Sequence, residues 1–292
     1  MRSDSGPQWH WREPYRCMWL QHGPIELNVE ADGLPGECAA AFAQLVESFS
    51  RTLNDLVTEL PDLRKPVMPN RGAPLRGTVA KRMKTACEPH ASQFVTPMAA
   101  VAGAVADHLL DAMIKGRTLK RAFVNNGGDI AIYLNKHQHY DIGICEQLTE
   151  ATMSSIANIG ADTAIRGIAT SGWQGRSHSL GIADAVTVLA NNAACADVAA
   201  TLIANEINVP NHPGVKRMAA NELSPDSDLK TQRVTVAVPA LSDASVDVAL
   251  RNGQRYADRL VQQKLINSAF MSLQGRVVLT GNKHDIEWRR TA

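Results

Sequence analysis

Residues 124–134 read VNNGGDIAIYL, and this short stretch sets the question of the fold. Two asparagines, two glycines and an aspartate stand directly before a run that is typical of a β-strand. The corner at 125–129 has two explanations. It is either a tight hairpin, for which paired glycines are favoured, or a place where the backbone comes close to a ligand, because glycine has no side chain.

The sequence around this corner predicts strands that arrive as hairpins. Residues 121–147 read as strand, corner, strand, polar turn and third strand, which predicts a β-meander. Alanine-rich helices are expected at 98–113, packed on a sheet containing 123–134, and at 193–207. Further helices are predicted at 36–60, ended by Pro61, and at 242–270, capped by Ser242 or Asp243. Hairpin strands with packed helices indicate an α+β fold.

Composition excludes several classes of function. Among 292 residues, 30 basic and 29 acidic side chains give a net charge of +1, and aromatic residues make up 5%. We therefore expect neither nucleic-acid nor membrane binding, because there is no strong field and no set of stacking platforms. The N-terminus shows no apolar signal segment, and no stretch approaches the ~18 apolar residues of a membrane span. Five scattered cysteines indicate reduced thiols and a cytoplasmic protein.

Asp197 and Thr201 are the first candidate site residues. They are four positions apart in a predicted helix, so their oxygens lie on one face, one turn apart. Hard oxygen donors of this kind suit Mg²⁺. The alternative is structural: an acid near a helix N-terminus favoured by the macrodipole, and a threonine bonding back to a carbonyl.

The stretch IATSGWQGRSHSLG at 168–181 is the second candidate. Its backbone amides, hydroxyls and Arg176 could cradle a phosphate, and an exposed polar hairpin is the alternative. A triad of Ser177, His178 and Asp184 is rejected, because adjacent residues on an extended chain point to opposite faces. His137 and His139 could share a face as a metal pair, but solvated histidines in a polar turn explain them better.

Several motifs in sequence order resemble the ApbE-like superfamily, whose best-known members are FAD:protein FMN transferases. They are VTPMAAVAGAVADHLL (95–110), VNNGGDIAIYL (124–134), YDIGICE (140–146), IATSG with RSHS (168–172 and 176–179), DAVTVLAN (184–191) and ADVAATLIAN (196–205). The pattern is still more similar to an uncharacterised cytoplasmic branch of that superfamily. The resemblance covers roughly residues 16–207.

The resemblance implies a T-fold-like architecture, with antiparallel sheets backed by helices. It also implies a single domain over 1–292, made of two related halves at roughly 16–160 and 161–284. It makes Asp197 and Thr201 ligands of Mg²⁺, with a backbone carbonyl near Ala100 or Val101. It places a flavin nucleotide such as FAD beside a pocket shared by both motif regions, lined by Asn125, Asn126, Gly127, Gly128, Asp129, Thr170, Ser171, Gly172, Arg176 and His178.

Departures from the transferases shape the expected function. Ala102 stands where their lysine would be, and SLGIADA (179–185) replaces their IIDPRTG loop. We therefore expect a cytoplasmic ApbE-like protein that binds a phosphate-bearing small molecule with a divalent metal, with metal-assisted phosphoryl or pyrophosphoryl chemistry as its reaction if it is an enzyme. The alternative is a non-catalytic binding or accessory protein that has lost FMN transfer. No catalytic residue is assigned.

Overall fold

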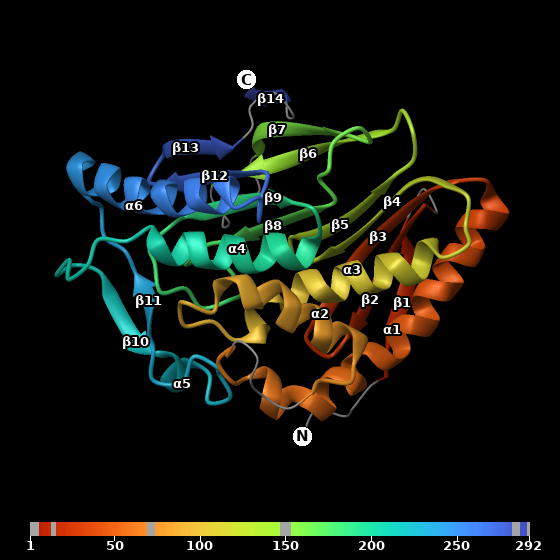
Figure 1. Ribbon diagram of the computed structural model, residues 1–292, viewed down its shortest axis with the longest axis horizontal. Coiled ribbons are helices and arrows are strands. Elements are labelled where there is room, and N and C mark those ends of the chain that lie inside the picture. Colours follow the sequence, from red (N-terminus) through yellow and green to blue (C-terminus); the bar gives the residue numbers. More distant parts are fainter. Residues whose placement is uncertain (1–5, 13–15, 69–73, 147–152, 282–286, 291–292) are drawn as a thin grey trace. The chain divides into compact units, whose positions relative to one another are not determined.

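A computed structural model describes residues 6–12, 16–68, 74–146, 153–281 and 287–290. The chain forms two compact units. Unit 1 comprises Met1–His139, Gly160–Ile168 and Asn191–Cys195, and unit 2 comprises Tyr140–Ile159, Ala169–Ala190 and Ala196–Ala292. Antiparallel strands and helices occur in both units (Figure 1), so the predicted α+β class is confirmed. The T-fold topology and the single domain of two related halves stay predictions.

The strands of unit 1 are neighbours in the order of the sequence. They are β1 (Gln8–Arg12), β2 (Cys17–His22), β3 (Ile25–Gly33), β4 (Leu119–Asn126) and β5 (Asp129–Leu134), each antiparallel to the next. The first residues of β8 (Gly167–Ser171) pair with the far edge of β5, where Ile168 lies opposite Ile130. Alternating buried residues in β3 and β4 show that one face of these strands is covered.

Helices cover this face of unit 1. They are α1 (Pro35–Leu63), α2 (Thr78–Cys87) and α3 (Val101–Ile114), with short 3₁₀ turns η1 (Glu88–His90) and η2 (Pro97–Ala100). Helix α3 contacts β4 and β5, and α1 contacts β3 and α3 (Figure 1). The buried helix predicted over 98–113 is confirmed, although its first residues form the 3₁₀ turn. Strands β4 and β5 therefore pack against a helix rich in small residues.

The predicted end of α1 at Pro61 is wrong, because the helix continues to Leu63 with Pro61 inside its last turn. Proline disrupts a helix by removing one amide hydrogen bond and by crowding the preceding turn. Close to the C-terminal end of a helix this disruption costs little, because few residues of the helix follow the proline. Leu63 is fully buried, which gives the helix a reason to continue past the proline.

One described helical segment, Pro97–Ile114, is long and apolar enough to cross a membrane by length and composition, contrary to the expectation from the sequence. More than half of it is buried within the protein. Its Asp107 accepts two backbone hydrogen bonds there. Such burial is typical of a core helix. The N-terminal segment, where a signal peptide would stand, lies partly outside the described residues.

Unit 2 contains three groups of strands. Strand β8 is followed by β9 (Ala185–Ala190), β12 (Ser268–Leu273) and β13 (Arg276–Gly281) as neighbours, with α6 (Asp243–Gln262) against β12 and β13. Strands β6 (His139–Cys145), β7 (Met153–Gly160) and β14 (Glu287–Arg290) form a second sheet. Strands β10 (Lys216–Ala219) and β11 (Arg233–Ala237) form a third. The remaining helices are α4 (Ala193–Glu206) and α5 (Ala220–Leu223).

The structure corrects two of the expected elements. The meander over 121–147 is wrong at its third strand, because β6 pairs with β7 and the free edge of β5 is taken by residues before and in β8. The helix over 242–270 is also wrong at its end. Lys264 has a φ of 58°, which is outside helical geometry, and 268–273 form the fully buried strand β12. Ser242 is confirmed as the cap of α6, accepting a hydrogen bond from the Ser245 amide.

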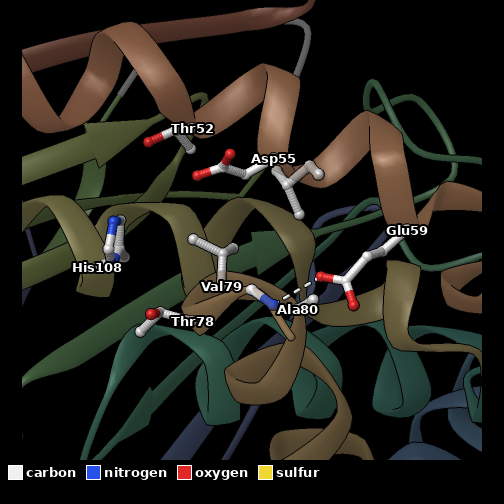
Figure 2. A pocket seen from close by; sticks show the side chains of 9 residues that line it. Thr52, Asp55, Glu59, Thr78, Val79, Ala80 and His108 are labelled. Atoms are coloured by element: carbon white, nitrogen blue, oxygen red, sulfur yellow. Dashed lines mark hydrogen bonds between the residues drawn. The ribbon is translucent and has the colours of Figure 1, made fainter. Parts of the chain in front are cut away.

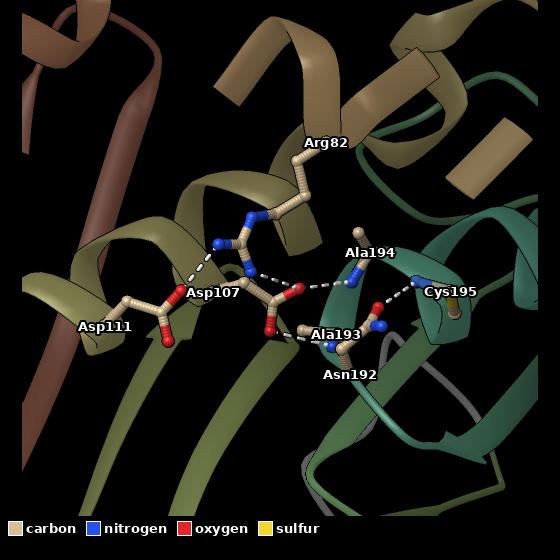
Figure 3. A network of polar contacts seen from close by, with 7 residues as sticks. All are labelled: Arg82, Asp107, Asp111, Asn192, Ala193, Ala194 and Cys195. Carbon is tan, nitrogen blue, oxygen red and sulfur yellow. Dashed lines mark hydrogen bonds and ion pairs between the residues drawn. The ribbon is translucent and has the colours of Figure 1, made fainter. Parts of the chain in front are cut away.

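A buried carboxylate fixes the start of α4 (Figure 3). The Asp107 side chain, 6% exposed, accepts hydrogen bonds from the amides of Ala193 and Ala194, both at 2.9 Å. The side chain of Asn192 accepts from the Cys195 amide at 2.8 Å. The first three amides of α4 therefore have acceptors, which a helix end needs when it is buried. Arg82 lies 3.8 Å from the Asp107 carboxylate and offsets its charge.

Gly103 makes this arrangement possible from the same face of α3, one turn before Asp107. A Cβ atom at position 103 would lie 2.3 Å from the carbonyl oxygen of Ala193 and 2.8 Å from the amide nitrogen of Ala194. Both are backbone atoms, so they cannot move aside as a flexible side chain would. Only glycine allows α3 to approach residues 193–194 closely enough for Asp107 to bind them.

We predict that Gly103→Ala destabilises the protein by about 1–3 kcal/mol or more, although alanine is the better helix former. The clash with Ala193 outweighs the gain in helix propensity. Urea denaturation measures the change. Gly36→Ala in α1 is the matched control, because its Cβ would have no atom within 4 Å. Equal stability of the two variants would contradict the close approach at Gly103.

Candidate functional site

The NNGGD corner is a two-residue hairpin. Gly127 and Gly128 have φ angles of 67° and 113°, and Asn126 and Asp129 pair across the turn. The Asn125 side chain accepts a hydrogen bond from the Gly128 amide at 2.8 Å. Both glycines are in backbone conformations that other residues rarely adopt, so the turn itself requires them. The hairpin explanation therefore accounts for the glycines, and the nearness of a ligand stays a prediction.

Asn126 has a separate structural role. Its side-chain amide donates to the Ala102 carbonyl in α3 at 3.1 Å, and the residue is 8% exposed. This bond ties the end of β4 to the first turn of α3. Ala102, at the position where the resemblance to the transferases leads one to expect a lysine, is half-buried in that turn. Within unit 1, the hydrogen bond from Asn126 to Ala102 therefore fixes the position of the NNGGD corner relative to the start of α3.

The second candidate segment, residues 170–178, continues from β8 into a loop of unit 2. Thr170 lies at the end of β8, and its hydroxyl is 2.9 Å from that of Thr187 in β9. Gly172 is buried and accepts a hydrogen bond from Gly175, closing a turn. Arg176 is exposed on this loop, and His178 is half-buried at its end. The loop therefore presents its guanidinium to the surface while its start is anchored in the sheet.

Asp184 anchors the same loop, a role that the sequence did not reveal. Its carboxylate accepts from the Gln274 amide at 2.6 Å and from the Trp173 indole at 3.3 Å, and Trp173 also bonds through its backbone to Ala183. Burial raises the pKa of this carboxyl, and the two hydrogen bonds oppose that shift. Trp173 directly follows Gly172, so Asp184 positions the end of the Thr170–Gly172 segment. The sequence did contain a signal for this role, because Asp184 is a charged residue directly before an apolar strand.

Asp197 and Thr201 both lie on α4, as predicted, and both are half-buried. Their spacing places them one turn apart on one face of that helix. The two structural explanations proposed for them were a charge in the first turn of the helix and a back-bonded threonine. Asp197 is the fifth residue of α4, beyond the first turn, whose amides are already bound by Asp107 and Asn192. Among the described residues, Thr201 also donates to no backbone carbonyl, whereas Thr52 donates to that of Ser48.

The predicted site residues fall in both units. Asn125–Asp129 belong to unit 1, and Thr170–Gly172, Arg176, His178, Asp197 and Thr201 belong to unit 2. The pocket that they were expected to share therefore stays a prediction. In the described part of the chain, no three His, Cys, Asp or Glu side chains are grouped as a metal would need. A metal on α4 would depend on Asp197, a hydroxyl, carbonyl oxygens, water and a ligand.

A small pocket in unit 1 has none of these residues in its lining (Figure 2). It is lined by Thr52, Asp55, Leu56, Glu59, Gly77, Thr78, Val79, Ala80 and His108. Its Glu59 carboxylate accepts from the backbone amides of Arg76 and Gly77 at 2.6 and 2.7 Å, and so ties the segment just before α2 to α1. His108 lies 3.1 Å from the Ser48 hydroxyl, and burial lowers its pKa, as expected for a histidine at the core boundary. We read this pocket as a helix junction.

The comparisons with known proteins identify the family. A family model described as AbpE bacteria matches residues 9–279, so the chain belongs to this ApbE-like family. A UPF0280 protein of Methanosarcina acetivorans is 37% identical over 206 residues, which are 68% of this chain and 76% of the relative. Another, from Methanosarcina barkeri, is 38% identical over 120 residues, or 39% of this chain and 44% of the relative. The matched part of the chain thus spans about three quarters of the Methanosarcina acetivorans protein and under half of the Methanosarcina barkeri protein.

Two solved structures show weaker likenesses. The flavinyl transferase ApbE of Pseudomonas stutzeri has 13% identity and a TM-score of 0.45, covering 95% of this chain and 94% of that one. A mutant of the flavin transferase ApbE of Vibrio cholerae has 12% identity and a TM-score of 0.46, covering 89% of this chain and 94% of that one.

We predict that Asp184→Ala lowers the free energy of unfolding by about 1–3 kcal/mol, because it leaves the Gln274 amide and the Trp173 indole without their acceptor. Proteolysis within 172–178 should become faster as well, since the loop loses its anchor. Glu222→Ala, at an exposed carboxylate of unit 2, is the control. An unchanged urea midpoint and cleavage rate for Asp184→Ala would show that the loop is held by other contacts.

Proposed function

We propose that this ApbE-like protein binds a phosphate-bearing small molecule together with Mg²⁺, with a flavin nucleotide such as FAD as the leading ligand. The pair Asp197 and Thr201 carries this proposal, because a carboxylate and a hydroxyl one turn apart on the same face of α4 are hard oxygen donors of the kind that Mg²⁺ prefers. Membership of the ApbE-like family supports a flavin ligand. The cytoplasmic location expected from the scattered cysteines of the sequence is part of this proposal.

The residues of this chain fit a weak magnesium site. A carboxylate and a hydroxyl one turn apart provide two hard oxygen donors, and a carbonyl near Ala100 or Val101 is the proposed third. Mg²⁺ usually keeps several waters and shares its shell with ligand phosphates, so a few protein donors suffice. Bound there, the ion would neutralise charge on a phosphoryl or pyrophosphoryl group.

The proposed ligand contacts divide by their chemistry. Thr170, Ser171 and Gly172 would offer hydroxyl and amide donors to phosphate oxygens, with Arg176 and His178 supplying positive charge. Asp184 would hold this loop in place through Trp173. The Asn125–Asp129 corner would present amide groups and a bare backbone to the rest of the ligand.

The alternative function is binding without catalysis. Ala102 lacks the cation that a lysine would provide, and residues 179–185 do not follow the DPRTG pattern of the transferases. Both departures remove groups that would act on the nucleotide, whereas Asp197 and Thr201 are retained. A protein of this kind would hold a nucleotide or present it to a partner.

We predict that FAD binds more tightly with Mg²⁺ than without it, and that Asp197→Asn abolishes the difference while leaving the fold intact. The neutral amide is a poor ligand for a hard cation. Titration calorimetry with and without Mg²⁺ measures the effect. Glu206→Gln is the matched control, because Glu206 is a half-buried acid on the same helix. Equal affinity with and without Mg²⁺ in both the wild type and Asp197→Asn would rule out the magnesium site.

We also predict little or no flavin transfer when the protein is incubated with FAD, Mg²⁺ and a threonine-bearing acceptor protein. The loss of one well-placed electrostatic stabiliser typically costs ~10²–10³ in rate, and this chain departs from the transferases at two places. Mass spectrometry of the acceptor and assay of released AMP provide the measurement. Robust flavinylation would make the protein a transferase and eliminate the binding-only alternative.

A further inference from the structure

Strand β1 is an edge with a second side available for pairing. Within the part of the chain that the structure describes, Gln8–Arg12 pairs only with β2. All five of its residues, QWHWR, are exposed. An edge strand offers a row of backbone donors and acceptors to another strand, and proteins usually blunt such edges with charges, prolines or covering segments. Strand β1 instead exposes two tryptophans, which favour pairing with another strand.

Both tryptophans lie on the face of the sheet that helices cover. Trp9 pairs with Leu20 and Trp11 with Met18, and these two partners are 0% and 3% exposed. Paired residues point to the same face, so Trp9 and Trp11 continue the apolar face of unit 1. Trp11 contacts Phe42 of α1 edge-on, with ring centroids 4.8 Å apart. Even so, Trp9 is 49% and Trp11 45% exposed, so the apolar face extends past its helical cover.

The sequence of β1 is complementary to itself. When two copies pair antiparallel about a two-fold axis at His10, Trp9 of each lies opposite Trp11 of the other, and Gln8 opposite Arg12. All four indoles then lie on one face, where aromatic cross-strand pairs stabilise a sheet. This register pairs all five residues and keeps the two arginines apart, whereas centring on Arg12 would place like charges opposite each other. An isologous contact of this kind is the usual basis of a dimer.

We propose that β1 is a homodimer interface, at which a second copy of this chain extends the sheet of unit 1. This inference is independent of the proposed ligand. A buried aromatic side chain removes about 150–250 Å² from water, and about half of each tryptophan is still exposed. Four indoles therefore contribute roughly 300–500 Å², against about 1,200–2,000 Å² for a stable interface. We expect a weak dimer that dissociates on dilution.

Sedimentation velocity over a wide range of concentrations tests the proposal with the full chain. The mass should rise from 31.6 kDa toward twice that value as concentration increases. His10→Glu places two carboxylates opposite each other at the axis and should raise the dissociation constant at least tenfold. Trp9→Thr keeps a good strand residue, removes an indole and should weaken association similarly. Val57→Thr, at a residue of α1 that is 55% exposed, is the control and should change nothing.

The register has its own test. His10→Cys should form an intermolecular disulfide under mild oxidation, because directly opposed residues of antiparallel strands have Cβ atoms about 4.5–5.5 Å apart. Peptide mapping should find the two copies joined at position 10. Circular dichroism checks that each variant is folded. A wild-type protein that stays monomeric at every concentration overturns the proposal, as does a dimer that is insensitive to both His10→Glu and Trp9→Thr.

Discussion

The helical layer of unit 1 depends on the hydrogen bonds that the Asp107 carboxylate accepts from the amides of Ala193 and Ala194. A buried acid is costly unless its oxygens are bound, and here each oxygen accepts a backbone amide from the start of α4. The amides are stabilised as well, because the first backbone N–H groups of a helix have no acceptors within the helix itself. Arg82 shares its charge between Asp107 and Asp111, at the edge of the same network. Gly103 supplies the space that lets the two helices meet.

Much of this fold could be predicted from local patterns. The buried helix after Pro97, the Ser242 cap and the hairpin at Gly127–Gly128 all follow from periodicity, capping and turn chemistry, which act within a few residues. The errors are non-local. Nothing near His139 says that β6 joins a different sheet from β5. Residues 268–273 follow a helix without a proline or glycine to mark the change, and only pairing with β9 and β13 identifies them as a strand.

The candidate site divides in the same way. The positions of Asp197 and Thr201 on one helix face could be predicted, because helical spacing fixes them. The supporting residues could not, since Asp184 and Asp107 act on segments far away in the sequence. In the sequence, Asp107 is a single charge that interrupts an apolar run. Gly103 and Asp107 are four residues apart, so they lie on one face of the helix. This spacing indicates a close contact only once the backbone of residues 193–194 is known to pack against both.

The long separation of Asp107 from its partners also affects how the chain acquires its structure. Ala193 lies 86 residues further along the chain, so α3 leaves the ribosome well before the amides that bind its carboxylate exist. Until then, burial of Asp107 is unfavourable, and α3 has a reason to stay partly hydrated. Contacts of high sequence separation form slowly because a long loop must close first. The contact between α3 and the start of α4 is therefore expected to form late in folding.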